Sequence, residues 1–280
     1  MSLRTEWLRF GSGREHVGFA AWPERAVLPL PAVIVIQEVW GVDAHVEDVT
    51  RRFAQAGYVA FAPDLYARSG ARPAPLARER VAEAQAFLNQ LPAGSSSAVI
   101  RDPQAREAAL AERAPAERAR LGETMGALFA GLGSGGMRLD EYVPPLAQAS
   151  DFLRREFQGT RGRKVAAVGF CMGGGLAALL ACHDPELSAA AIFYGSAPPE
   201  ALLANIRCPV AGFYGELDKR ITDAVPAFAA AMQRAGKTFE PHVYEGAQHA
   251  FFNDTRPSYD VRAARDGFAR VLDLFRRTLA

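Results

Sequence analysis

The sequence contains few cysteines: its 280 residues include only Cys171, Cys182 and Cys208. An odd and sparse set of this kind does not make the disulfide framework that small secreted proteins use. No CxxC pair and no Cys/His cluster has the spacing of a zinc site. We therefore expect neither disulfide bonds nor a bound metal.

The sequence also lacks a strong charge of either sign, since its formal net charge is +1. The arginines are scattered and form no basic stripe, which argues against a nucleic-acid partner. No apolar run approaches the roughly 20 residues of a membrane span, and residues 1–7 show no apolar core of a signal peptide. Gly169, Gly173 and Gly174 do not form the phosphate-binding pattern GxGxxG, and the pattern GxxxxGK[ST] is absent. We therefore expect a cytoplasmic protein without a nucleotide cofactor and without a membrane partner.

What the sequence does contain is a series of short apolar runs bounded by turn residues. Nearly half of the residues are hydrophobic and 22% are charged, as in ordinary globular proteins. Runs that are apolar on both faces suit strands of a parallel sheet covered by helices. The predicted strands are residues 32–36, 58–62, 164–170, 189–194, 210–214 and 239–244.

Helical patterns alternate with these runs. The predicted helices lie at residues 45–56, 173–182, 223–235 and 262–279. Strands that alternate with helices indicate βαβ units and a mostly parallel, doubly wound α/β sheet with helices on both faces. Residues 16–22 are expected to add an antiparallel edge strand.

Residues 72–157 interrupt this alternation. Segments 76–91, 103–129 and 140–157 have helical patterns rich in alanine, arginine and glutamate. We interpret the chain as a single domain over residues 1–280 with a helical insertion at residues 72–140. The insertion either covers the site as a cap or is a solvent-exposed helical segment outside the site. The sequence leaves both alternatives open.

One glycine-rich turn carries a nucleophile candidate. Gly169-Phe170-Cys171-Met172-Gly173 follows a predicted strand and opens a helix of small residues, which is the context of the nucleophile turn of α/β-hydrolases. The helix N-terminus favours a thiolate at Cys171, and the Met172 N–H can donate to an oxyanion. The alternative is a buried cysteine that only packs in the core, and Cys182 and Cys208 fit that description.

A thiol nucleophile needs a base, and the fold class places the acid and the histidine after the nucleophile in the chain. His249 follows the last predicted strand, whereas His242 lies inside that strand and fits a packing role. Asp218 follows the preceding strand and is the better candidate for the acid. Glu216, in the same loop, fits a loop charge or a helper.

A further carboxylate, Glu38, follows the first parallel strand, in Gln37-Glu38-Val39-Trp40-Gly41. It would face Cys171, and the Val39 N–H could supply the second oxyanion donor. A loop or helix-capping carboxylate is the alternative. Trp40, Phe251 and Phe252 are candidates for an apolar substrate-binding wall, although large aromatic residues are more often part of a core.

Four segments together resemble the dienelactone hydrolase family: residues 37–41, 63–66, 169–174 and 246–251. The resemblance covers residues 14–75 and 138–278. It implies an α/β-hydrolase with a triad of Cys171, Asp218 and His249. It also implies that Glu38 hydrogen-bonds the thiol and helps to form the thiolate when substrate arrives.

The chain departs from the family pattern in its substrate-binding residues. The family holds the substrate carboxylate with two arginines, one of them four residues after the catalytic histidine. That position is Asn253 here, which can donate hydrogen bonds but has no charge. Arg78 and Arg80 are candidates for the other arginine. Residues 90–137 are longer than the family pattern.

These observations predict a hydrolase that cleaves a small-molecule carboxylic ester or lactone through a cysteine thioester. A general carboxylesterase or a thioesterase on the same fold is the first alternative. A redox-sensing or ligand-binding protein with a reactive Cys171 is the second, and the absence of a CxxC pair argues against it. The sequence leaves a monomer and a homodimer open.

Overall fold

A single eight-stranded sheet forms the centre of the computed structural model, which describes residues 2–92, 95–130 and 138–280. The strand order is β1-β2-β4-β3-β5-β6-β7-β8. The strands are β1 (Leu3–Phe10), β2 (His16–Pro23), β3 (Ala32–Ile36), β4 (Val59–Pro63), β5 (Val165–Phe170), β6 (Ala190–Phe193), β7 (Val210–Gly215) and β8 (Phe239–Tyr244). All pairings among the six strands β3 to β8 are parallel. Strand β2 pairs antiparallel with both β4 and β1. The predicted mostly parallel α/β sheet is confirmed.

The antiparallel strand β2 was expected at the edge of the sheet, and this detail of the prediction is wrong. Strand β1 lies outside it, with Trp7 opposite Phe19 and Phe10 opposite His16. Most residues of β1 are exposed or half-buried, because it is an edge strand. Its sequence therefore contains no continuous apolar run from which a strand could be recognised.

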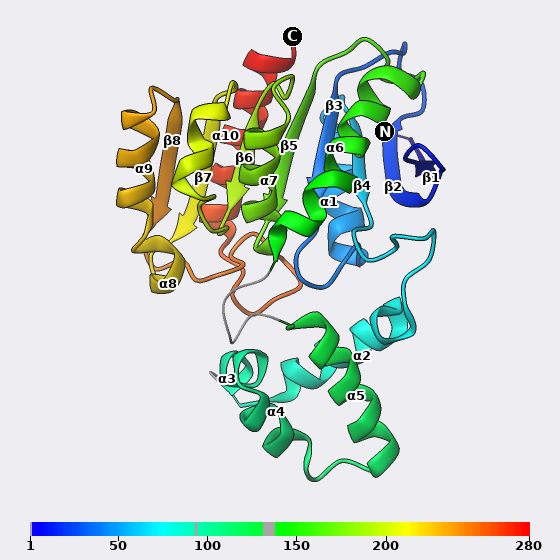
Figure 1. Cartoon of the computed structure of the whole chain (residues 1–280), viewed down its shortest axis with the longest axis vertical. Helices are drawn as coiled ribbons and strands as arrows, with labels where there is room; N and C mark the ends of the chain where they lie inside the picture. The colour runs from blue at the N-terminus through cyan, green and yellow to red at the C-terminus, as the bar shows by residue number, and fades with distance from the viewer. Residues whose placement is uncertain (1, 93–94, 131–137) are drawn as a thin grey trace.

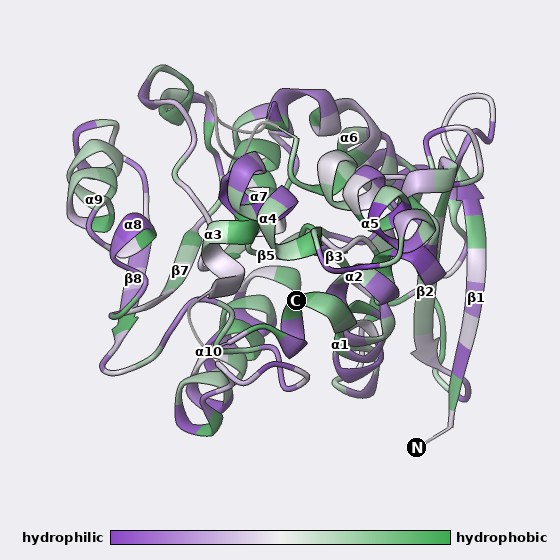
Figure 2. Ribbon diagram, turned by 90° about the horizontal axis from the view of Figure 1, so that it is seen from below, coloured by the Kyte–Doolittle hydropathy of each residue, from purple (hydrophilic) through white to green (hydrophobic). Residues whose placement is uncertain are grey.

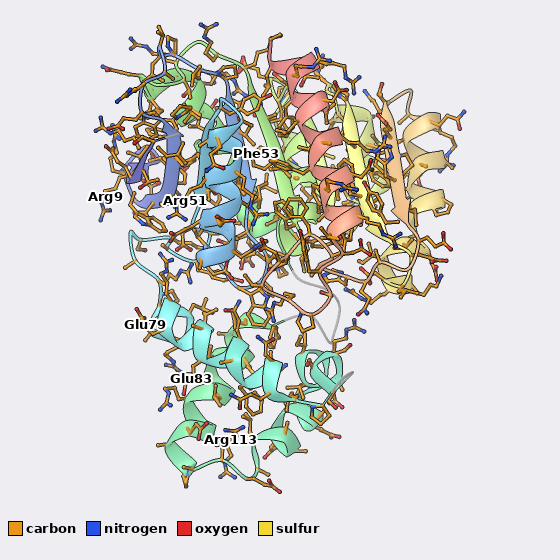
Figure 3. All side chains as sticks on the ribbon, turned by 180° about the vertical axis from the view of Figure 1, so that it is seen from behind. Arg9, Arg51, Phe53, Glu79, Glu83 and Arg113 are labelled. Carbon is orange, nitrogen blue, oxygen red and sulfur yellow. The ribbon has the colours of Figure 1, made fainter. Side chains whose placement is uncertain are left out.

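Helices cover both faces of the sheet (Figure 1). The helices are α1 (Ala44–Gln55), α2 (Arg78–Gln90), α3 (Ser95–Arg101), α4 (Pro103–Leu110), α5 (Pro115–Leu128), α6 (Val143–Asp151), α7 (Met172–His183), α8 (Lys219–Thr222), α9 (Val225–Arg234) and α10 (Val261–Leu279). Helices α1 and α10 lie on one face, where Phe53 of α1 packs against Phe268 and Phe275 of α10 (Figure 3). Helices α6, α7 and α9 lie on the other face (Figure 1).

The hydropathy of the chain follows these layers (Figure 2). Strands β3, β4, β5 and β7 are buried along their whole length, whereas the outer strands β1 and β8 alternate between hydrophobic and hydrophilic segments (Figure 2). Burial on both faces explains why the central strands have continuous apolar sequences. These strands form a rigid support for the loops at their carboxyl ends.

Helices α2, α3, α4 and α5 form a lobe at the carboxyl-end edge of the sheet (Figure 1). The expected single helix over residues 103–129 is two helices, since the chain turns at residues 111–114 and α5 begins with Pro115. Pro115 has no N–H to donate, so it suits the first turn of a new helix. Leu121, Met125 and Phe129 belong to the same hydrophobic cluster as Trp40 of the main body. The lobe is thus packed onto the sheet domain.

No helix in the described parts of the chain combines the length and the apolar character that crossing a membrane requires.

Candidate active site

Cys171 lies on the sharp turn between β5 and α7, at the carboxyl edge of the sheet. Its backbone is left-handed, with φ 54° and ψ −115°, and its side chain is half-buried. Such a conformation is strained for a residue with a side chain. The flanking glycines make the turn possible, because a Cβ at Gly169 would lie 1.8 Å from the Gly173 oxygen. A Cβ at Gly173 would in turn lie 2.3 Å from the Ile36 oxygen of β3.

His249 and Asp218 lie on neighbouring loops that follow β8 and β7. His249 Nδ1 is 2.5 Å from Asp218 Oδ2, and the Asp218 side chain is nearly buried. The two loops are tied together, because the Leu217 N–H donates to the Ala247 oxygen and the Gly246 N–H donates to Glu216. One hydrogen bond thus links Asp218 to His249, and Glu216 links the two loops.

Opposing influences act on the pKa of His249. Burial by itself lowers it, but the nearby Cys171 sulfur and the hydrogen bond to Asp218 outweigh burial and raise the pKa to about 10. The other two thiols have a different environment: burial raises the pKa of Cys182 to about 11 and that of Cys208 to about 12. Both therefore stay neutral at physiological pH and fit a packing role.

Two backbone N–H groups are candidates for an oxyanion-binding role, one after the neighbouring strand β3 and one directly after Cys171. Val39 follows β3, and Met172 is the first residue of α7. Neither N–H donates to a backbone or side-chain acceptor among the described residues. Free N–H groups on neighbouring strand ends, one of them at a helix N-terminus, are the donors that a developing oxyanion needs.

Glu38 is buried, with 3% of its surface exposed. Its Oε1 accepts a hydrogen bond from the Tyr194 hydroxyl at 3.3 Å, and its Oε2 accepts one from the Asn253 amide at 3.0 Å. Cys171 is not among the hydrogen-bond partners of Glu38 in the described chain. The expected contact between the carboxylate and the thiol is thus replaced by two neutral donors.

A cavity of about 550 Å³ opens beside this site. Its walls come from the N-terminal end of α1, from α2 of the lobe and from the loop after His249. Trp40, directly after Val39, lines the cavity, whereas Cys171, Asp218, His249 and Glu38 do not. The residues around it are Trp40, Val42, Asp43, Ala44, His45, Arg72, Arg78, Glu79, Val81, Ala82, Gln85, Ala86, Asn89, Thr255 and Arg256.

Two of the three charged or amide side chains considered for substrate binding are engaged elsewhere. Arg78 lines the cavity and pairs with Glu47. Arg80 points to α5, where it bonds Thr124 and Glu123. Asn253 is 1% exposed and holds Glu38. Only Arg78 of the three therefore reaches the cavity.

Of the three aromatic residues considered for the wall, only Trp40 lines the cavity. Its ring contacts Phe129 at 5.7 Å between centroids. Phe252 is buried and packs against Phe170. Phe251 is fully buried and packs against Tyr194 and Tyr244, so it belongs to the core. The apolar wall is therefore formed by Trp40 with residues of α2.

Tyr194 and Arg256 were not predicted from the sequence as site residues. Tyr194 ends the β6 run with φ +40°, and its ring lies 5.0 Å from that of His249. Arg256 stacks on Trp40 at 4.8 Å and donates to Asn89 of α2. Its Nη2 is buried without a hydrogen-bond partner in the described chain. Nothing in the sequence indicates the positive φ of Tyr194. A tyrosine followed by Gly195 at the end of a predicted strand is the one pattern that could have marked it as a site residue.

The sheet order and the strand-turn-helix that carries Cys171 define an α/β-hydrolase. The model of the "Dienelactone hydrolase family" matches residues 17–279. The chain belongs to this family and is a hydrolase.

Known relatives agree in length and fold. A protein of Saccharolobus solfataricus, provisionally named carboxymethylenebutenolidase, is 31% identical over 274 residues, which cover 95% of each chain. The crystal structure of a provisionally named dienelactone hydrolase from Klebsiella pneumoniae is 28% identical, with a TM-score of 0.70, and covers 99% of this chain and 100% of that one. A dienelactone hydrolase structure from Anabaena variabilis, at 14% identity and a TM-score of 0.62 over 100% of both chains, shares the fold.

Proposed function

We propose that the protein hydrolyses a small carboxylic ester or lactone through a thioester formed on Cys171. The observation that carries this proposal is the arrangement of Cys171 on its strained turn beside His249, which Asp218 holds at 2.5 Å. The raised pKa of His249 supports an imidazolium paired with a thiolate. A thiolate attacks carbonyl carbons without further activation.

In the first half of the reaction, the Cys171 sulfur attacks the carbonyl carbon and a C–S bond forms. The carbonyl oxygen becomes an oxyanion between the N–H groups of Val39 and Met172, each worth roughly 3 kcal/mol in enzymes where such donors were removed. The C–O bond of the ester then breaks, and His249 gives its proton to the leaving alkoxide. Asp218 stabilises the imidazolium before this transfer.

In the second half, water must attack the thioester. His249 is now neutral and takes a proton from the water as its oxygen bonds to the carbonyl carbon. The C–S bond breaks, and the carboxylic acid product leaves the Cys171 thiolate behind. His249 thus serves as acid and then as base.

Glu38 has a supporting role in this proposal. Its carboxylate is buried beside the catalytic residues, and the Tyr194 hydroxyl and the Asn253 amide stabilise its charge. Because both of its oxygens are engaged, Glu38 fixes Tyr194, whose ring lies 5.0 Å from that of His249.

The cavity is the candidate for the substrate-binding region, and the α2–α5 lobe for a cap. Gln85 bonds Asp43, and Asn89 bonds Arg256, so α2 is tied to two loops of the main body. Relatives named carboxymethylenebutenolidase support a lactone. Arg256 offers the free guanidinium nitrogen that an anionic group on such a substrate would meet.

The test is turnover of 4-nitrophenyl acetate and of a dienelactone by purified protein. Replacement of Cys171 by alanine should lower kcat by about a thousandfold or more. The His249→Asn variant should accumulate a covalent acyl adduct, because its thioester lacks the base for hydrolysis. Mass spectrometry of peptides after acid quench should place the adduct on Cys171.

Cys182→Ala is the matched control, since this thiol is buried in α7. It should leave both activities within about twofold of the wild type. Wild-type turnover in Cys171→Ala would sink the proposal. A sulfenate on Cys171, without any acyl adduct, would favour a redox function instead.

A further inference from the structure

The turn that carries the candidate oxyanion donor Val39 is attached to a second loop by buried side chains. This turn comprises Glu38–Gly41, because the Gly41 N–H donates to the Glu38 oxygen at 3.2 Å. The Glu38 oxygen belongs to the same peptide unit as the Val39 N–H, and the two point in opposite directions. The bond from Gly41 therefore directs the Val39 N–H away from the interior of the turn.

The next peptide unit is held by Tyr66, which lies on the loop after β4. Its hydroxyl donates to the Val39 oxygen at 2.7 Å. The Tyr66 ring is nearly buried, and burial raises the pKa of the hydroxyl far above its ordinary value, so that it remains a donor. Rotation of the Val39 backbone would break this bond and leave a buried carbonyl unpaired, which is costly.

Arg72 holds the end of the same turn. Its Nη2 donates to the Val42 oxygen at 3.1 Å, and its Nε bonds Asp64 at 2.7 Å in a nearly buried ion pair. Gly41 has φ +80°, and a Cβ there would lie 2.6 Å from the Arg72 guanidinium. The guanidinium thus packs directly against the turn.

The two loops are connected at a third point, where the Leu65 N–H donates to the Gln37 side-chain oxygen at 3.1 Å. Asp64 also accepts from the Tyr66 N–H, so one carboxylate orders both the tyrosine and the arginine. None of these side chains forms part of the Cys171, Asp218 and His249 arrangement. Tyr66 and Arg72 bond the backbone oxygens of Val39 and Val42, and Asp64 holds both of these side chains in place.

We propose that Tyr66 is a positioning residue that acts through the Val39 peptide to keep the oxyanion donor aligned, with Arg72 and Asp64 as its support. This inference rests on the proposed function, because it requires the Val39 N–H to bind the oxyanion. Tyr66 touches neither sulfur nor substrate in this role. It lowers the activation free energy indirectly, because it keeps the Val39 N–H aligned with the developing oxyanion. A preorganised donor stabilises the oxyanion less when it is misaligned.

The experiment is the Tyr66→Phe variant, which removes only the hydroxyl and keeps the ring. We expect kcat for 4-nitrophenyl acetate to fall about tenfold with KM nearly unchanged, as loss of a buried hydrogen bond to the Val39 carbonyl implies. The inhibition constant of a phenyl trifluoromethyl ketone, whose adduct with the thiol carries an oxyanion, should rise by a similar factor. The rate of Cys171 alkylation by iodoacetamide as a function of pH should stay that of the wild type.

Tyr58→Phe is the matched control, because Tyr58 packs against Phe275 on the opposite face of the sheet. It should leave kcat, the inhibition constant and the alkylation profile unchanged. An unchanged kcat in Tyr66→Phe overturns the inference. A lower kcat also overturns it if the pH profile of alkylation changes, or if the inhibition constant of the ketone stays that of the wild type. Failure of the proposed function would appear separately, as full activity in Cys171→Ala.

Discussion

The Asn253 amide donates a hydrogen bond of 3.0 Å to Glu38 Oε2, across 215 positions of the sequence. Asn253 accepts in turn from the N–H and the hydroxyl of Thr255, so its polar groups are used within the protein. In the family pattern this position binds a substrate carboxylate through an arginine. In this chain the position holds the buried glutamate instead.

Loss of the Asn253 amide should destabilise the fold, because Glu38 would remain buried with one partner fewer. We expect Asn253→Ala to lower the free energy of unfolding by about 2–3 kcal/mol, as for buried hydrogen bonds to charged groups. Urea denaturation measures this change. The exposed Asn205→Ala should stay within about 0.5 kcal/mol of the wild type. Equal stabilities of the two variants would contradict the role assigned to Asn253.

The raised pKa of His249 gives a prediction with a definite sign. Burial lowers this pKa, while the negative thiolate of Cys171 and the bond to Asp218 raise it, because both favour the charged ring. Cys171→Ala removes the thiolate, so the pKa of His249 should fall. The pH titration of the ring protons by NMR measures this change.

Two variants complete the titration experiment. Cys182→Ala should leave the His249 titration as in the wild type, because Cys182 is buried within α7. Asp218→Asn should lower the pKa of His249 as well, since it removes the second favourable interaction. An identical titration in the wild type and in Cys171→Ala would refute the ion pair.

The sequence was sufficient for the central strands and for the order of the candidate triad. Strands β3, β5 and β7 are buried on both faces, so each is a continuous apolar run that needs no alignment to be recognised. Cys171, Asp218 and His249 lie in the segments that follow the carboxyl ends of β5, β7 and β8. Local patterns therefore carried this part of the prediction.

Features that depend on distant contacts could not be predicted. Strand β1 has too many exposed residues to form an apolar run, and its pairing with β2 decides its structure. The engagement of Glu38 by Asn253 requires the loops after β3 and β8 to meet. Arg256 is a candidate substrate-binding residue only because it stacks on Trp40, and no spacing in the sequence indicates that contact.

The glycines of the nucleophile turn should be intolerant of any side chain. A Cβ at Gly169 would lie 1.8 Å from the Gly173 oxygen, so Gly169→Ala must displace the first turn of α7. We expect a loss of about 3 kcal/mol or more in the free energy of unfolding, together with loss of turnover. Thermal and urea denaturation measure the first effect.

Gly126→Ala is the matched control for this substitution. Gly126 lies within α5, where a Cβ would meet no atom of the described chain within 4 Å apart from its neighbours and the backbone of its own helix. Alanine there should raise the stability by about 0.5–1 kcal/mol, because glycine loses more backbone entropy in a helix. A Gly169→Ala variant as stable as Gly126→Ala would show that the turn relaxes without cost.

Arg256 should decide whether anionic substrates are accepted. Its guanidinium is fixed by Trp40 and Asn89, and its Nη2 has no partner in the described chain. Arg256→Gln should lower kcat/KM for mono-4-nitrophenyl glutarate, which carries a carboxylate, by about tenfold to a hundredfold, in line with hydrogen bonds between charged groups. The neutral ester 4-nitrophenyl valerate, of the same length, should change by less than about threefold.

Arg80→Gln provides the comparison, because Arg80 bonds Thr124 and Glu123 of α5 and does not line the cavity. It should leave the ratio of the two kcat/KM values as in the wild type. A parallel fall for both esters in Arg256→Gln would mean that Arg256 only fixes Trp40 and α2. A fall confined to the carboxylate ester assigns the charged group of the substrate to the cavity between α2 and the loop after His249.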